Sequence, residues 1–265
     1  MPGDLHSRFA ASFARFADRP LVEAHGRTFT YAEIEALSAR LATRLCELGV
    51  APGERVLVQT AKSVETLALY FAVVRTGAIY LPLNTDYTEA ELDYFAGDAT
   101  PVLAVCREGD EALFALIGKG GVTVTTLATL FNSLPDEADP PASRAPDDIV
   151  AILYTSGTTG KPKGATLTQR NLAANGETLI ELWRFTEEDR LIHALPIFHV
   201  HGLFVAVHCV LFSGSSMVFL DKFESGAVID LMAHSTVLMG VPTFYNRLLS
   251  DERFTQRSAA NMRLF

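Results

Sequence analysis

The sequence predicts an α/β fold in which mostly parallel sheets are covered by helices. Short β-rich runs alternate with helical segments: Arg55–Thr60 is strand-like, a helix runs from Ser63 to Gly77, and Ala78–Leu83 is the next strand. Strand-helix-strand units of this kind favour parallel sheets covered on both faces. With 265 residues, 49% of them hydrophobic and 20% charged, the chain is long enough to bury a substantial core.

Capping patterns locate the helices of the first half. Thr30 with Glu33, and Thr88 with Glu91, have the spacing of capping boxes. Asp4 is suited to cap an amphipathic first helix whose apolar positions are Leu5, Phe9, Phe13 and Phe16. A mitochondrial presequence is the alternative for this arginine-containing segment. Further strands are expected at Val102–Cys106 and Val122–Thr126.

The alternation resumes after an acidic, proline-rich stretch. We therefore expect a first α/β subdomain at 1–132, a surface linker at 133–148 and a second α/β subdomain at 149–265. The strands expected in the second subdomain are Ile149–Tyr154, Leu191–Leu195, Ser216–Leu220 and Thr236–Val241. The helices are Thr168–Arg184, Gly202–Phe212, Ala227–Ala233 and one that begins at Pro242. The segment Asn261–Phe265 resembles the start of another strand, which suggests the front portion of a longer protein.

Charge and composition restrict the partners. Lys and Arg number 22 and Asp and Glu 31, so the net charge of −9 disfavours general binding to nucleic acid or to an anionic membrane. The three cysteines are far apart and show no disulfide or zinc spacing. No apolar run reaches the ~20 residues that span a bilayer. We expect a soluble, cytoplasmic protein with small-molecule partners. The sequence does not predict its oligomeric state.

The segment Ile152–Ala165, ILYTSGTTGKPKGA, has the chemistry of an anion-binding loop. It follows a predicted strand at the sheet edge where open α/β folds bind ligands. Three glycines permit positive φ angles and an inward-facing nest of N–H groups. Four hydroxyl groups and two lysines add donors and positive charge.

Two other interpretations of this loop fit less well. A flexible linker seldom follows a buried strand and carries two lysines around a proline. The Walker pattern GxxxxGK[ST] fails because Thr155 stands at its first glycine and Pro162 follows Lys161.

Histidines cluster in Ala194–Phe204, ALPIFHVHGLF. His199 and His201 face the same way if the segment is extended, so they could bind zinc together. Completing that site would require His193 and His208 to fold back, and no carboxylate lies at ligand spacing. His208, inside an apolar helical run, is equally consistent with a core histidine bonded to backbone carbonyls.

The sequence YTSGTTGKPKG resembles the phosphate-binding motif of the adenylate-forming superfamily, which includes acyl-CoA synthetases. The resemblance implies that this chain is an incomplete N-terminal domain of such an enzyme, with ATP, Mg²⁺ and CoA as reactants or cofactors. It also implies that Thr158 contacts Mg²⁺ through water. The residues implied to bind the ATP phosphates are Thr155, Ser156, Gly157, Thr158, Thr159, Gly160, Lys161, Lys163 and Gly164.

The pattern Pro-x-Phe-His-x-x-Gly resembles a second motif of this superfamily. Its residues here are Pro196, Phe198, His199 and Gly202. By this resemblance His199 is the catalytic candidate, at a corner between the ATP and acyl sites. Phe244 and Tyr245 could equally line the acyl pocket or pack in the hydrophobic core. The candidates for binding the acid are His199, His201, Phe198, Gly202, Pro242 and Phe244.

The runs Leu81–Phe95, His193–Phe204 and Thr236–Leu249 resemble the malonyl-CoA synthetases. This implies activation of a short acid, malonate, to acyl-AMP and then acyl-CoA; methylmalonate or acetate are alternatives. The family's magnesium glutamate, its adenylation lysine and its C-terminal lid domain have no counterpart in residues 1–265. We therefore expect this fragment alone to be inactive. A truncated, non-catalytic nucleotide-binding relative is the alternative from another functional class.

Overall fold

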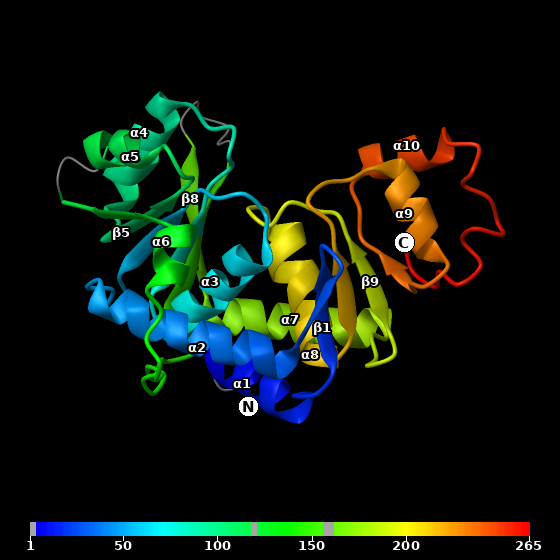
Figure 1. The fold of residues 1–265 in the computed structure, drawn as a ribbon, viewed down its shortest axis with the longest axis horizontal. Helices are drawn as coiled ribbons and strands as arrows, with labels where there is room; N and C mark the ends of the chain where they lie inside the picture. The colour runs from blue at the N-terminus through cyan, green and yellow to red at the C-terminus, as the bar shows by residue number, and fades with distance from the viewer. Residues whose placement is uncertain (1–3, 118–120, 156–161) are drawn as a thin grey trace. The chain divides into compact units, whose positions relative to one another are not determined.

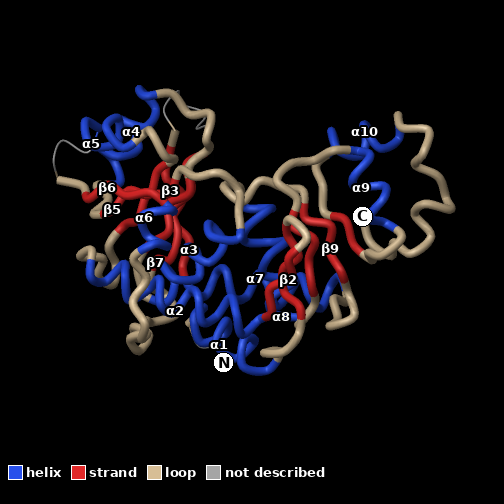
Figure 2. The backbone as a smooth tube through the Cα atoms, viewed as in Figure 1, coloured by secondary structure: helices blue, strands red, loops and turns tan. Residues whose placement is uncertain are grey.

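The computed structural model describes residues 4–117, 121–155 and 162–265. The chain divides into two compact units. The first consists of Met1–Ser7 and Glu35–Ala173, and the second of Arg8–Ile34 and Ala174–Phe265. Each unit contains its own sheet and the helices that cover it (Figures 1 and 2). The expected fold class is confirmed.

In the first unit the described residues form a six-stranded sheet in the order β6-β5-β3-β4-β7-β8. Every neighbouring pair is parallel except β7 and β8, which are antiparallel. The strands are β3 (Arg55–Val58), β4 (Ile79–Pro82), β5 (Leu103–Cys106), β6 (Thr123–Thr126), β7 (Ile149–Thr155) and β8 (Lys163–Thr168). The helices are α3 (Val64–Arg75), α4 (Glu89–Ala99), α5 (Glu111–Ile117) and α6 (Leu127–Asn132).

Helices cover both faces of this sheet. Neighbouring residues of a strand point to opposite faces, so the apolar side chains on each face need a helix to pack against. On one face, Leu57 of β3 and Leu81 of β4 join a core cluster with Phe95 of α4, and α5 contributes to the same cluster. On the other face, the Tyr80 ring of β4 lies 5.1 Å from the Tyr70 ring of α3. All these side chains are buried. The sheet is therefore buried by helices on both faces, and a loop can be held at its edge.

The acidic, proline-rich segment 133–148 contains no helix or strand, and it packs onto the first unit. The guanidinium of Arg40 donates a hydrogen bond to the Pro135 carbonyl, and the Asp139 N–H donates to the Thr43 hydroxyl. The next strands, β7 and β8, pair with the first sheet. The units are therefore divided differently from the expected ranges 1–132 and 149–265.

In the second unit the described residues form a five-stranded sheet in the order β11-β9-β10-β1-β2. Only the β1–β2 hairpin is antiparallel. Where the sequence predicts the start of a strand near Asn261, the structure has an isolated parallel bridge between Leu264 and Val237. The strands are β1 (Pro20–Ala24), β2 (Arg27–Thr30), β9 (Arg190–His193), β10 (Ser216–Phe219) and β11 (Val237–Leu238). The helices within this unit are α8 (His208–Ser213), α9 (Ser225–Met232) and α10 (Pro242–Leu249).

Three further helices contribute residues to both units: α1 (Leu5–Arg15), α2 (Tyr31–Glu47) and α7 (Gln169–Trp183). Within the second unit, the rings of Phe9 and His208 lie 5.3 Å apart, and the Tyr31 hydroxyl donates to the carbonyls of Val210 and Ser215. The first helix is thus a packed element of the fold, with Phe9 and Phe13 buried.

The capping predictions are confirmed. The Thr30 N–H donates to the Glu33 carboxylate at 2.7 Å, and the Glu33 N–H donates back to the Thr30 hydroxyl at 3.2 Å. Thr88 and Glu91 form the same reciprocal pair at the start of α4. These bonds satisfy backbone donors that a helix start leaves without partners.

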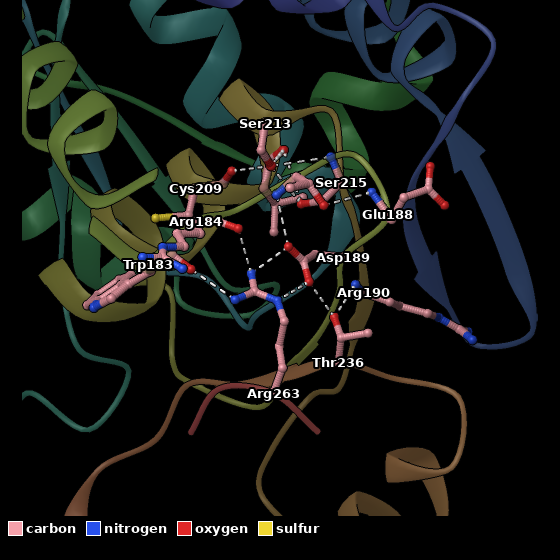
Figure 3. A network of polar contacts seen from close by, with 12 residues as sticks. Trp183, Arg184, Glu188, Asp189, Arg190, Cys209, Ser213, Ser215, Thr236 and Arg263 are labelled. Carbon is pink, nitrogen blue, oxygen red and sulfur yellow. Dashed lines mark hydrogen bonds and ion pairs between the residues drawn. The ribbon is translucent and has the colours of Figure 1, made fainter. Parts of the chain in front are cut away.

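A buried carboxylate organises the start of β9 (Figure 3). Asp189 is only 4% exposed, and its two oxygens accept hydrogen bonds from Arg263 at 2.7 and 2.5 Å. The Thr236 hydroxyl and the Thr186 N–H also donate to it, at 2.7 and 2.9 Å. Burial alone would raise the pKa of Asp189, but these hydrogen bonds outweigh burial and hold the pKa below its usual value.

Within the described ranges, no helix is both long enough and apolar enough to cross a membrane.

Candidate functional site

The predicted phosphate loop joins the two strands of a β-hairpin. β7 pairs with β4 in parallel, as expected, and β8 returns antiparallel to it. Thr155 at the end of β7 is the register partner of Lys163 at the start of β8, and both are exposed. Six of the predicted phosphate contacts lie outside the described residues: Ser156, Gly157, Thr158, Thr159, Gly160 and Lys161.

Gly164 corrects one part of the sequence interpretation. It lies in β8 opposite Tyr154, and it does not have the positive φ angle expected of a nest glycine. A Cβ atom here would lie 3.0 Å from Cγ2 of Ile152 and 3.5 Å from the Tyr154 ring. The glycine is therefore needed for close packing across the hairpin. Its contact with phosphate stays a prediction.

The histidine motif follows β9 as a sharp turn that leads into a helix. His199 is exposed at this turn, and the Phe198 and His199 rings lie 4.4 Å apart. The expected helix is present, but its first part is a π-helix, η1 (His201–Val207), which continues directly into α8. π-Helical turns are rare and are frequent at functional sites. His201, the first residue of η1, is half-buried.

Gly202 fixes the geometry of this turn. A Cβ atom on Gly202 would lie 2.1 Å from the Pro196 carbonyl oxygen, which leaves room only for glycine. The buried side chain of His193 places its Nε2 atom 2.8 Å from the Gly202 carbonyl oxygen. Since a carbonyl only accepts, His193 donates from Nε2, which sets its tautomer. Sequence reasoning gave His193 only a minor place in a zinc set, so this contact was missed.

Partial burial of the rings lowers the pKa of both His199 and His201 from the usual value. At neutral pH each ring is therefore mainly neutral, with one nitrogen as a donor and the other as an acceptor. Such a pair can hydrogen-bond a carboxylate without supplying a full positive charge. Among the described residues, no group of three His, Cys, Asp or Glu side chains is arranged to hold a metal ion.

His201 lines a cavity of about 280 Å³ within the second unit. Tyr245 of α10 lines the same cavity, and burial raises the pKa of its hydroxyl, which therefore stays protonated. Phe244 instead stacks on Phe223, with ring centroids 4.0 Å apart and planes 16° apart, and it is a partly buried residue packed against a core cluster. Trp183 is a lining residue that no sequence motif pointed to. The complete lining is Trp183, His201, Met239, Gly240, Tyr245, Leu264 and Phe265.

The sequence and the fold of the chain are similar to those of known proteins. The mitochondrial malonate–CoA ligase ACSF3 of Mus musculus is 35% identical over 259 residues, which cover 91% of this chain and 44% of that enzyme. The crystal structure of apo MatB from Rhodopseudomonas palustris superposes with a TM-score of 0.94 at 47% identity, covering 100% of this chain and 54% of MatB. ATP-bound MatB gives a TM-score of 0.93 at 48% identity, covering 98% and 54%.

The chain spans roughly half the length of the curated relatives it matches, between 44% and 48% for the first three. This agrees with the expectation that it corresponds to the front portion of a longer enzyme. Residues 9–265 match the family described as AMP-binding enzyme, which confirms the predicted superfamily. The chain belongs to the AMP-binding enzyme family.

Proposed function

We propose that the full-length protein is an AMP-forming acid–thiol ligase that converts malonate to malonyl-CoA. A carboxylate oxygen of the acid attacks the α-phosphorus of ATP, forming the acyl-AMP anhydride and releasing pyrophosphate. The sulfur of CoA then attacks the acyl carbon, and AMP leaves as the carbon–oxygen bond breaks. The observation that carries this proposal is the likeness to the malonate–CoA ligase ACSF3 of Mus musculus, at 35% identity over 91% of this chain. The likeness to ATP-bound MatB, at 48% identity over 98% of this chain, supports ATP as the nucleotide.

The phosphate loop is proposed to hold the β- and γ-phosphates of ATP. Its six central residues are assigned on sequence alone, and the exposed positions of Thr155 and Lys163 at the loop end of the hairpin are consistent with the assignment. Oriented N–H groups, hydroxyls and ammonium groups stabilise the charge on the pyrophosphate as it leaves. Mg²⁺ would neutralise the same oxygens, with Thr158 proposed to contact it through water.

The cavity beside His201 supports a small acid. Its volume of about 280 Å³ lies just below the range for drug-sized ligands, about 300–1,000 Å³, as suits a small acid. His201 and Tyr245 add an imidazole and a phenol to an otherwise mostly apolar lining. We propose that His199 hydrogen-bonds the reacting carboxylate and that His201 faces the rest of the acid. The shape of the acid-binding region is then set by Phe198, Gly202, Pro242 and Phe244.

The test is acid-dependent ATP–pyrophosphate exchange by the full-length protein with malonate, methylmalonate and acetate. Malonate should give the highest kcat/KM. Exchange with acetate equal to that with malonate would end the malonate proposal, and no exchange with any acid would end the ligase proposal. The 265-residue chain alone should show no exchange, because it lacks the family's downstream glutamate and lysine.

A further inference from the structure

Within the first unit, one side of α4 packs against strand β7. Strands β7 and β8 form the stem of the hairpin that carries the phosphate loop. The Tyr94 hydroxyl of α4 donates a 2.8 Å hydrogen bond to the carbonyl oxygen of Pro162, the residue directly before Lys163. This contact spans 68 positions in the sequence, and it reaches the stem where β8 begins. The run Leu81–Phe95 resembled the malonyl enzymes in sequence, yet no site residue had been assigned to it.

The second strand of the stem is tied to the same helix. The Tyr154 hydroxyl of β7 donates a 2.6 Å hydrogen bond to the carboxylate of Asp98. Tyr94 and Asp98 are four residues apart, so they lie on one face of α4. Burial, followed by the hydrogen bond to Asp98, raises the pKa of Tyr154, so its hydroxyl stays protonated and continues to donate.

Aromatic packing fills the space between the two hydrogen bonds. The Phe95 and Tyr154 rings lie 4.4 Å apart, and the Tyr94 and Tyr154 rings lie 6.3 Å apart at 69°. Phe95 is fully buried in the core cluster of the first sheet. Across the hairpin, Gly164 lies opposite Tyr154, and a Cβ atom there would lie 3.0 Å from Cγ2 of Ile152. The stem is therefore anchored to the hydrophobic core through α4.

We propose that Tyr94 is a positioning residue for Lys163, which it holds in place through the backbone of Pro162. The inference rests on the proposed function, in which Lys163 contacts the ATP phosphates. A lysine side chain is long and flexible, so the precision of its ammonium group depends on how firmly its backbone is held. Fixing the backbone in advance removes an entropy cost that ATP binding would otherwise bear.

The test is Tyr94→Phe in the full-length protein, because this change removes the hydroxyl and keeps the ring contacts. Loss of one hydrogen bond worth about 0.5–1.5 kcal/mol corresponds to about a 2- to 12-fold weaker interaction. We expect the KM and Kd for ATP to rise within that range, while the KM for the acid stays unchanged and the melting temperature falls by no more than a few degrees. Tyr154→Phe should act in the same direction, whereas Asp98→Asn keeps an acceptor oxygen and should stay near wild type.

Tyr87→Phe is the matched control, since the Tyr87 ring lies 4.9 Å from the same Phe95 ring and the change leaves the Tyr94 bond intact. An unchanged Kd for ATP in Tyr94→Phe would overturn the inference, as would an equal rise in the KM values for ATP and acid. ATP binding measured by calorimetry separates the two proposals. Wild-type protein that binds ATP without acid-dependent exchange overturns the proposed function alone, and wild-type protein that does not bind ATP overturns both.

Discussion

The carboxylate of Asp189 accepts two hydrogen bonds from the guanidinium of Arg263, a residue 74 positions later in the sequence. Arg263 also donates to the backbone carbonyls of Trp183 and Arg184 at 2.9 and 3.1 Å. One side chain therefore joins the end of α7, the start of β9 and the segment that bridges to β11 (Figure 3). Two predictions concern this pair.

Arg263→Met should destabilise the second unit, because it leaves the buried Asp189 carboxylate without its cation. Breaking a fully buried pair costs about 3–5 kcal/mol, and we expect about 2 kcal/mol here because the arginine side chain is partly exposed. Urea unfolding of the protein measures the change. Arg253→Met removes an exposed partner of Asp251 and serves as the control, with almost no effect expected. Equal losses in the two variants would contradict the role of burial.

Asp189 should also make stability depend on pH. Since the pKa of Asp189 is lower in the folded state than in the unfolded chain, its contribution is present above the unfolded value of about 4. The contribution is lost as the pH falls through the folded pKa. The stability difference between wild type and Asp189→Asn should therefore be constant from pH 5 to pH 7 and shrink toward pH 3. A difference that does not change with pH would show that folding does not lower the pKa of Asp189.

Gly202→Ala should disturb the histidine turn, because the new methyl group meets the Pro196 carbonyl at 2.1 Å. Overpacking of this kind costs about 1–3 kcal/mol. The KM for the acid should rise as His199 and His201 move with the backbone. Gly97→Ala on α4 adds a methyl group where nothing lies within 4 Å, and it should be neutral or slightly stabilising. A melting temperature and an acid KM equal to wild type in Gly202→Ala would disprove the close contact.

Lys163→Ala and Thr158→Val should each lower adenylation without unfolding the protein. Hydrogen bonds to charged groups contribute about 1.5–3 kcal/mol, so loss of the lysine should reduce kcat/KM for ATP by about 10- to 100-fold. Lys163 is exposed, which is why the fold should tolerate alanine. Lys222→Ala removes a different exposed lysine, paired with Glu224, and should leave the kinetics unchanged. Wild-type kinetics in both loop variants would remove the phosphate role assigned to this loop.

His199→Ala should raise the KM for the acid more than the KM for ATP, because the imidazole is proposed to hydrogen-bond the substrate carboxylate. His25→Ala, at an exposed histidine beside Asp221, is the control and should change neither constant. The comparison requires full kinetics of the full-length protein with malonate and ATP varied in turn. A larger effect on ATP would assign His199 to the nucleotide side.

Local signals predicted most of the fold. The capping pairs at Thr30 and Thr88 could be predicted because each hydrogen bond joins residues only three positions apart in the sequence. The β8 strand was not predicted, because Lys163–Thr168 has no hydrophobic run and its first three residues were included in the anion-binding segment Ile152–Ala165. Strand β2 was missed for the same reason, since Arg27–Thr30 has no buried residue. Its partner β1 was also missed, although Leu21 and Val22 are buried.

The contacts that shape the candidate site are mostly long-range, so no pattern in the sequence shows them. The bond from Tyr94 to Pro162 depends on which strands pair, and the position of Phe244 against the core depends on Phe223. The π-helix at His201–Val207 has the composition of an ordinary buried helix. Residue types predicted the chemistry of the site, whereas packing decides which side chains reach it.

The separation between Asp189 and Arg263 also has a consequence for synthesis on the ribosome. When β9 emerges, the arginine that neutralises Asp189 has yet to be translated, and 74 further positions must be added before the pair can form. At bacterial or eukaryotic elongation rates of about 5–20 residues per second, this delay lasts several seconds. During that interval the end of the second sheet holds an acidic group without its partner. A nascent chain should therefore gain resistance to proteolysis in this region only after Arg263 has left the exit tunnel.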